Sequence, residues 1–134
     1  MNNIFVYGSL MFAPVWDRII ANHYQKCEAH LHGFKRLSIK NEVYPALVKA
    51  HEHSVSGVLI FDLRDSDLAS LDQFEGDYYQ RTPVQVEDKN GTLHLSDVYL
   101  FDQQYSHLLL DSEWDLNKFS QTGIDEFLSH YAGF

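Results

Sequence analysis

The sequence predicts an α+β fold, a small, mixed, partly closed β-barrel with two or three flanking helices. Segments with strand patterns outnumber segments with helical patterns, and the helical segments are inserted between the strands. The chain has 134 residues, 45% of them hydrophobic, which fits a single domain over residues 1–134. No internal repeat, low-complexity stretch or Pro/Gly/Ser-rich linker divides the sequence, so we expect the domain to be continuous.

The first half of the chain predicts three strands and one helix. Residues 3–7 are a short apolar run stopped by Gly8, which indicates a buried strand. Pro14 suits the first turn of a helix, and apolar residues recur at helical spacing after it. Residues 27–40 alternate in polarity at their start and are expected to be extended. Residues 55–63 give the strongest strand signal, so we expect this strand to be central.

Two further helices are predicted, one in the middle of the chain and one at its end. In residues 65–76, Asp65 or Ser66 is expected to cap the N-terminus, and Gly76 to end the helix. Residues 121–134 predict a terminal helix because apolar residues recur on one side. That side consists of Ile124, Phe127, Leu128 and Tyr131.

A β-hairpin is predicted between these helices. Residues 78–88 and 92–102 alternate in polarity around Asn90 and Gly91, a dipeptide that favours a tight type I′ turn. The apolar positions of the second strand change phase around Ser96. We therefore expect a β-bulge there.

Composition excludes several classes of partner. The chain has 10 Lys+Arg against 19 Asp+Glu, a formal net charge of −9. Nucleic acids and anionic membranes require clustered positive charge, so we expect neither as a partner. No apolar run approaches the ~20 residues that span a bilayer, and no signal-peptide pattern opens the sequence. With only Cys27 available for disulfide chemistry, we expect a cytoplasmic protein.

The first candidate site is the turn formed by Tyr7, Gly8, Ser9 and Leu10, which follows a predicted strand. Gly8 lacks a Cβ, so the backbone can turn sharply and approach a ligand closely. Successive amides in such a turn can converge on a carboxylate or a developing oxyanion, and Ser9 adds a hydroxyl group. Ordinary strand-to-helix turns have the same residues, so the tetrapeptide alone does not assign a site.

The second candidate is Glu75, at the end of the predicted middle helix. Its carboxylate would lie at the negative end of the helix dipole, which disfavours ionisation. Phe74, Tyr78 and Tyr79 flank it and can desolvate it, which raises the pKa further. A carboxyl group with such a pKa suits a general base that must also return a proton. A solvated glutamate in a last helical turn is the alternative.

Other reactive side chains give weaker signals. Tyr79 and Arg81 lie two residues apart on a strand, where they would share a face and either bind a carboxylate substrate or cover the barrel rim. Cys27 has no base placed beside it by a motif, so we do not expect a nucleophile there. No metal site is predicted, because the H-x-H pairs lack a third ligand. These pairs are His30 with His32 and His51 with His53.

Taken in order, these segments resemble the gamma-glutamylcyclotransferase-like family, and within it the short bacterial branch. The resemblance extends over nearly the whole chain. The paired occurrence of the turn and the Phe74-Glu75-Gly76 segment is more specific than either alone, and it favours a functional site at both. The matching segments are Val6-Tyr7-Gly8-Ser9-Leu10, Tyr44-Pro45-Ala46, Gly57-Val58-Leu59, Leu71-Asp72-Gln73-Phe74-Glu75-Gly76 with Tyr79 and Arg81, Val98-Tyr99, Trp114-Asp115, Phe119, Gly123 and Tyr131 through Phe134.

The resemblance implies a compact β-barrel with a pocket between the turn and the glutamate. It implies that the turn residues grip the glutamyl end of a small γ-glutamyl substrate, with Glu75 as catalytic acid/base. The implied reaction is intramolecular aminolysis, in which the α-amine attacks the side-chain carbonyl. It gives 5-oxoproline and a free amine or amino acid, and it needs no cofactor. Residues 11–16 are bulky and apolar, and we expect them to narrow the pocket or favour a hydrophobic leaving group.

Two other functions fit the same residues. One is a non-catalytic module that binds a small carboxylate in the same pocket. The other is an acyl hydrolase or transferase in which Glu75 activates water or another nucleophile.

Overall fold

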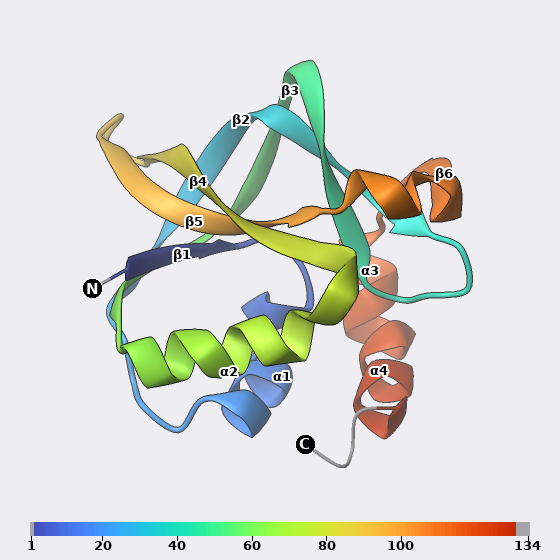
Figure 1. The fold of residues 1–134 in the computed structure, drawn as a ribbon, viewed down its shortest axis with the longest axis horizontal. Helices are drawn as coiled ribbons and strands as arrows, with labels where there is room; N and C mark the ends of the chain where they lie inside the picture. The colour runs from blue at the N-terminus through green and yellow to red at the C-terminus, as the bar shows by residue number, and fades with distance from the viewer. Residues whose placement is uncertain (1, 131–134) are drawn as a thin grey trace.

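A computed structural model describes residues 2–130 and shows a closed, mixed five-stranded β-barrel with one additional strand (Figure 1). The sheet order is β3-β1-β5-β4-β2-β6, and pairing of β3 with β2 closes the barrel. The predicted fold class is therefore confirmed. The strands are β1 (Asn2–Val6), β2 (Lys26–Ile39), β3 (Pro45–Leu63), β4 (Tyr79–Asp88), β5 (Leu93–Phe101) and β6 (Leu109–Glu113).

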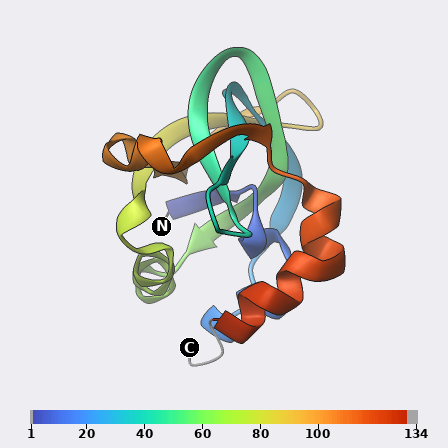
Figure 2. The ribbon, with the colours of Figure 1, turned by 90° about the vertical axis from the view of Figure 1, so that its right-hand side faces the viewer.

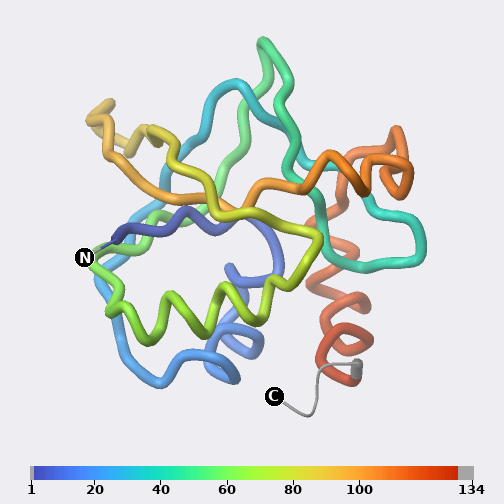
Figure 3. The backbone as a smooth tube through the Cα atoms, in the orientation of Figure 1, coloured from blue at the N-terminus to red at the C-terminus, as the bar shows by residue number. Residues whose placement is uncertain are grey.

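The main helices lie on one side of the barrel (Figures 1 and 3). Figure 2 shows α2 and α4 on either side of the segment that joins β2 to β3. The α-helices are α1 (Ala13–Ile19), α2 (Asp65–Glu75), α3 (Leu116–Lys118) and α4 (Ile124–His130). The other helical turns are the 3₁₀ turns η1 (Ser9–Met11), η2 (Gly76–Tyr78) and η3 (Gln103–Leu108), and the π-helical turn η4 (Phe119–Gly123).

Strand β1 positions the segment that directly follows it along the chain. It runs parallel to β5 and antiparallel to β3, and Ile4 and Phe5 are fully buried on its two faces. Ile4 packs in the cluster that the helices cover, whereas Phe5 packs in the barrel interior with Leu31 and Leu59. Because both faces of β1 are covered, the segment after it starts from a rigid base.

Strand β3 is much longer than predicted. It begins at Pro45, whereas the sequence indicated only residues 55–63. Residues 51–54 are exposed, so this part of the strand has no buried face and no apolar alternation to signal it. Its pairing with β2 supplies the extended conformation instead.

Helix α2 has the predicted extent but not the predicted cap. Arg64 occupies the N-cap position and makes no side-chain capping hydrogen bond, so the prediction of Asp65 or Ser66 as N-cap is wrong. Both residues lie instead in the first turn, where Asp65 complements the positive end of the helix dipole. The helix ends at Gly76 as predicted, where φ is 71°.

The hairpin between β4 and β5 forms as predicted, but with a different turn. The Asp88 carboxylate accepts hydrogen bonds from the N–H groups of Asn90 and Thr92, and the Asp88 carbonyl accepts one from Gly91. Only Gly91 of the central pair has a positive φ, 82°, whereas a type I′ turn requires two. Capping by Asp88 therefore favours a type I turn followed by a left-handed glycine.

The predicted bulge in β5 is wrong, because its register with β4 runs without a shift. Leu93, Leu95, Tyr99 and Phe101 all lie on one face of the strand. The first two are 58% and 72% exposed, whereas the last two are buried against helical segments. The apolar pattern of the sequence thus changes near Ser96 because helical segments cover this face of β5 at Tyr99 and Phe101 but not at Leu93 and Leu95.

The C-terminal part of the chain differs most from prediction. Strand β6 was not predicted because its residues are mainly exposed and polar; it is defined by pairing with β2. Helical structure begins at Leu116 rather than at residue 121. Phe127 is buried on the predicted apolar side, and Tyr131 lies outside the described residues. Within residues 2–130, no helix combines the length and apolarity needed to cross a bilayer.

Candidate active site

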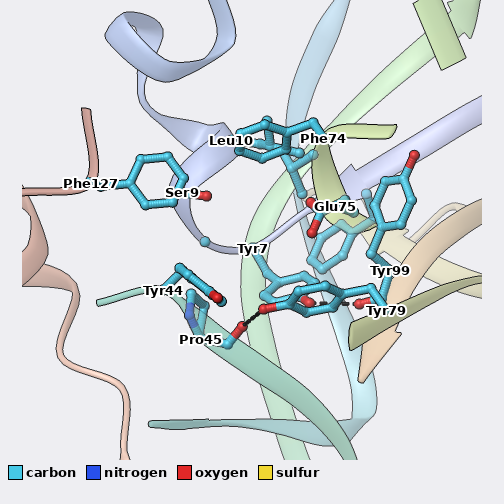
Figure 4. Close-up of a pocket in the computed structure, with 13 residues that line it drawn as sticks. Tyr7, Ser9, Leu10, Tyr44, Pro45, Phe74, Glu75, Tyr79, Tyr99 and Phe127 are labelled. Atoms are coloured by element: carbon cyan, nitrogen blue, oxygen red, sulfur yellow. Dashed lines mark hydrogen bonds between the residues drawn. The ribbon is translucent and has the colours of Figure 1, made fainter. Parts of the chain in front are cut away.

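An open cavity lies between the turn after β1 and the end of α2 (Figure 4); its empty space is about 500 Å³ when the solvent at its mouth is included. Both predicted site segments line it: the turn formed by Tyr7, Gly8, Ser9 and Leu10, and the glutamate at position 75. Most of the remaining lining is aromatic or aliphatic. It consists of Phe5, Val6, Tyr44, Pro45, Phe74, Tyr79, Tyr99 and Phe127.

The turn leaves β1 after Val6 and continues into the 3₁₀ turn η1 at Ser9. Tyr7, Ser9 and Leu10 are buried, so the turn forms an inner wall of the cavity. The first N–H groups of a helical turn have no partner within that turn. The wall therefore offers main-chain donors beside the Ser9 hydroxyl group.

Gly8 makes this wall possible because it lies against Pro45 at the start of β3. A Cβ at position 8 would be 2.6 Å from Pro45 Cγ and 2.8 Å from Pro45 Cδ. A pyrrolidine ring cannot move aside as the end of a flexible side chain can. The Tyr79 hydroxyl group holds the same proline by donating a hydrogen bond of 2.6 Å to its carbonyl.

Tyr7 and Arg36 fix the turn from behind. The Tyr7 hydroxyl group donates to the Tyr99 carbonyl at 2.6 Å, and burial raises the pKa of this phenol, which therefore stays neutral. Arg36 Nη1 donates to the Tyr7 carbonyl at 2.9 Å. The role of Arg36 was not predicted, because an arginine on a half-buried strand has no sequence pattern that identifies its partner.

Glu75 is the last residue of α2, and its side chain points into the cavity among Phe74, Tyr7 and Tyr99 (Figure 4). Burial of the carboxyl group raises its pKa to about 8, and the negative charge of Asp72 acts in the same direction. This is the predicted direction, with desolvation as the main cause. Among the described lining residues, Glu75 is the only one with a carboxyl, amino, guanidinium or imidazole side chain.

Arg81 does not line the cavity, in contrast to Tyr79. Its guanidinium group binds Asp72, with Nε–Oδ1 at 3.0 Å, and Asp97, with Nη1–Oδ2 at 2.9 Å. The Tyr99 hydroxyl group donates to the same Asp72 Oδ1 at 2.7 Å. The expected contact of Arg81 with a substrate is therefore not supported; the residue neutralises the aspartate that lies behind Glu75.

Two other expectations concern residues 11–16, which follow the turn, and a metal site. None of residues 11–16 lines the cavity, so the expectation that they narrow it is wrong. Met11, Ala13 and Trp16 instead line a separate hollow on the other side of Leu10. Over the described part of the chain, no group of three or more His, Cys, Asp or Glu residues is arranged to hold a metal ion.

Comparison with known proteins relates the chain, rather than the site alone, to a family. The model of the family described as gamma-glutamyl cyclotransferase, AIG2-like, matches residues 4–116. AIG2-like protein D of Arabidopsis thaliana is 35% identical over 130 residues, which cover 96% of this chain and 85% of that protein. Protein AIG2 C of the same plant is 26% identical over 131 residues, covering 97% and 79% of the two chains.

Solved structures show the same fold. A solution structure of an Arabidopsis thaliana protein gives a TM-score of 0.71 at 26% identity, covering 98% of this chain and 79% of that one. A structure named gamma-glutamyl cyclotransferase gives 0.68 at 18% identity, covering 99% and 87%. The second likeness is one of fold alone.

Proposed function

The chain belongs to the gamma-glutamyl cyclotransferase, AIG2-like family, and on this premise we propose that it converts a γ-glutamyl amine or peptide into 5-oxoproline and a free amine or amino acid. One observation carries the proposal: a carboxyl group of raised pKa and a turn with main-chain donors line the same apolar cavity. Membership of the short bacterial branch stays a prediction, since the relatives reported above are plant proteins. A cytoplasmic location also stays a prediction.

In the proposed reaction, Glu75 is the general base and then the general acid. It takes a proton from the substrate's α-ammonium group, and the freed amine attacks the γ-carbonyl carbon. A C–N bond forms, and the carbonyl electrons move onto the oxygen to give a tetrahedral oxyanion. When the intermediate collapses, the bond to the leaving nitrogen breaks and Glu75 returns the first proton to that nitrogen. The ring nitrogen is cationic after the attack, and its second proton passes through the same carboxylate to the released amine, which leaves as an ammonium ion.

The turn wall is proposed to bind the negative part of the substrate. The N–H groups of Gly8, Ser9 and Leu10 would donate either to the α-carboxylate or to the oxyanion. Tyr7 and Tyr79 would complete the binding surface. The reaction as written involves no metal or organic cofactor.

Substrate conformation supplies much of the expected acceleration. Ring closure is intramolecular, and well-oriented reactions of this kind reach effective molarities of about 10⁵–10⁸ M. The main task of the cavity is therefore to hold the glutamyl chain folded back on itself. Its aromatic walls suit this task because they restrict the space without competing for the reacting groups.

The raised pKa of Glu75 fits this proton transfer. With a pKa of about 8, the carboxyl group of the empty site is mainly neutral at pH 7. A bound ammonium group favours the carboxylate form and lowers that pKa. Ionised Glu75 is thus expected mainly where the substrate has supplied the compensating charge.

Product analysis tests the proposal. The purified chain is incubated with a panel of γ-glutamyl amines and γ-glutamyl dipeptides, and 5-oxoproline is measured by mass spectrometry, with Glu75→Gln as the control. We expect 5-oxoproline from the wild type alone. Free glutamate as product would instead identify a hydrolase. Saturable binding without any product would identify a non-catalytic binding module.

A further inference from the structure

The half-buried guanidinium group of Arg36, on β2, has an unusual set of partners. Its Nη1 donates to the Tyr7 carbonyl, and its Cζ lies 5.6 Å from the centroid of the Trp114 ring. Within residues 2–130 no carboxylate oxygen lies within 4 Å of it, and its Nε is buried without a hydrogen-bond partner. Burial lowers the pKa of this guanidinium group, and Glu113 opposes that shift only through space, without a direct ion pair.

The hydrogen bond of Arg36 connects it to the cavity through one peptide group. The Tyr7 carbonyl and the Gly8 N–H belong to the same planar, trans peptide, so the two point in opposite directions. No backbone acceptor for the Gly8 N–H is found in the described part of the chain. Gly8 itself lines the cavity, and its N–H points away from the carbonyl oxygen that Arg36 binds.

A cation on the carbonyl oxygen changes the other end of the peptide. It draws electron density toward the oxygen, and resonance transmits this change to the nitrogen. The N–H group becomes a stronger donor, as in other chains of mutually polarised hydrogen bonds. Positive charge thus acts at the cavity although none of its described lining residues is a lysine or an arginine.

We propose that Arg36 is a positioning residue that strengthens the Gly8 N–H as a donor to the negatively charged part of the bound ligand. The proposal rests on the proposed function for the identity of that part, the α-carboxylate or the oxyanion of a γ-glutamyl substrate. It also gives Arg36 a second negative charge besides that of Glu113, because an anion held by the Gly8 N–H lies at the other end of the same peptide group. In a chain with a net charge of −9, an anionic ligand needs such local compensation.

Two substitutions separate the charge of Arg36 from its role as a donor. Arg36→Gln keeps an N–H donor without charge, and Arg36→Lys keeps the charge without the planar fork. The matched control is Lys35→Gln, which makes the same charge change one residue away, on the opposite face of β2. All three are compared with the wild type at equal ionic strength.

The first measurement does not depend on activity. In the ¹H–¹⁵N spectrum of the labelled protein, we expect the Gly8 amide proton to move upfield in Arg36→Gln and to stay closer to its wild-type position in Arg36→Lys. A Gly8 resonance that is unchanged in Arg36→Gln overturns the proposal. Equal shifts in both variants overturn it as well, because a purely structural role does not distinguish them.

The second measurement uses the ligand. Titration with 5-oxoproline and steady-state turnover of a γ-glutamyl amine are compared across the variants. We expect Arg36→Gln to lose about tenfold to a hundredfold in kcat/KM, less than removal of a whole oxyanion donor, and Lys35→Gln to match the wild type. A fall in kcat assigns the Gly8 N–H as a donor to the oxyanion. A rise in KM assigns it as a donor to the α-carboxylate. Wild-type activity in Arg36→Gln overturns the proposal.

The two proposals can fail separately. A wild type that makes no 5-oxoproline removes the cyclotransferase assignment, while the Gly8 shift still tests the effect of Arg36 on the peptide. A wild type that is active and shows no Arg36-dependent change in the Gly8 resonance removes only the role of Arg36.

Discussion

The two walls of the cavity are held in opposite ways. The turn wall is fixed: Gly8 lies against the ring of Pro45, and the peptide before it is tied to Arg36. The opposite wall offers one flexible side chain, Glu75, to which no described residue donates a hydrogen bond in the structure. A wall that only holds charge can be made of immobile dipoles, whereas a wall that transfers a proton needs a group free to change its protonation state.

The charges behind the two walls also differ in sign. Arg36 is positive and lies behind the turn, whereas Asp72 is negative and lies behind Glu75. Arg81 partly compensates Asp72 by pairing with it. A zwitterionic glutamyl group, with its carboxylate toward the turn and its ammonium toward Glu75, matches this polarity. If the walls have separate tasks, a substitution in the Glu75 wall should affect proton transfer, and one in the turn wall should affect binding.

The largest expected effect comes from Glu75→Gln, which removes the proton-transferring group and keeps the shape of the wall. Loss of a general base is expected to lower kcat by about 10²–10⁴-fold. Affinity for 5-oxoproline is expected to change little, because the turn wall stays intact. Turnover is measured by mass spectrometry and affinity by titration.

Two other outcomes for Glu75→Gln would contradict these expectations. Unchanged turnover in this variant would exclude position 75 as the base. A similar loss of binding and of turnover would show that the two walls do not have separate tasks.

Gly8→Ala is expected to have the next largest effect, this time on binding and stability. The added Cβ would lie 2.6 Å from Pro45 Cγ, so the turn must move. Overpacking of this kind costs about 1–3 kcal/mol in stability. We expect a lower melting temperature and weaker binding of 5-oxoproline, both measured by calorimetry.

A second substitution identifies the cause. Pro45→Ala removes the ring atoms that the new Cβ would meet, so Gly8→Ala should be less harmful in that background. Additive losses in the double variant would contradict close packing as the reason for glycine at this position.

The two walls also differ in how well the sequence predicts them. The turn and Glu75 were found because local signals identify them: a glycine after an apolar run, and a carboxyl group at a helix end. Arg36 and Asp72 were not found, because their importance depends on which strands pair and which helix face meets β4. The same reason explains Arg81, whose expected ligand was a substrate and whose observed ligands are aspartates.

The elements of the fold also differ in how well the sequence predicts them, and for the same reason. Segments with a buried face, such as β1 and α2, carry their own apolar pattern and were predicted closely. The first half of β3 and all of β6 have little or no such pattern. They are extended because β2 pairs with them, and pairing between distant segments is not encoded in local periodicity.

The third prediction concerns pH, because only the Glu75 wall titrates near neutrality. The pH dependence of kcat/KM reports the ionisation of groups in the free protein, in which the pKa of Glu75 is about 8. We therefore expect kcat/KM to rise with pH, with a value at pH 7 about tenfold below the plateau. Arg81→Gln should move this limb to higher pH, since Asp72 then loses its compensating charge.

Stability should depend on pH in the opposite direction. The folded-state pKa of Glu75 is raised above the ordinary value of 4.5, so its contribution to stability is complete below pH 4.5 and is lost as pH rises toward 8. Denaturant unfolding of the wild type and of Glu75→Gln over this range measures the difference. A constant difference between the two proteins would show that the pKa of Glu75 is not raised.

The smallest expected effect comes from Tyr79→Phe, which removes one hydrogen bond to Pro45, the residue that supports the turn wall. The lost bond to the Pro45 carbonyl contributes about 0.5–1.5 kcal/mol. Because Pro45 supports Gly8, we expect a modest rise in KM and little change in kcat or in the pH profile. If instead kcat falls strongly while KM is unchanged, the Tyr79 hydroxyl group takes part in proton transfer, and the two walls are chemically connected through it.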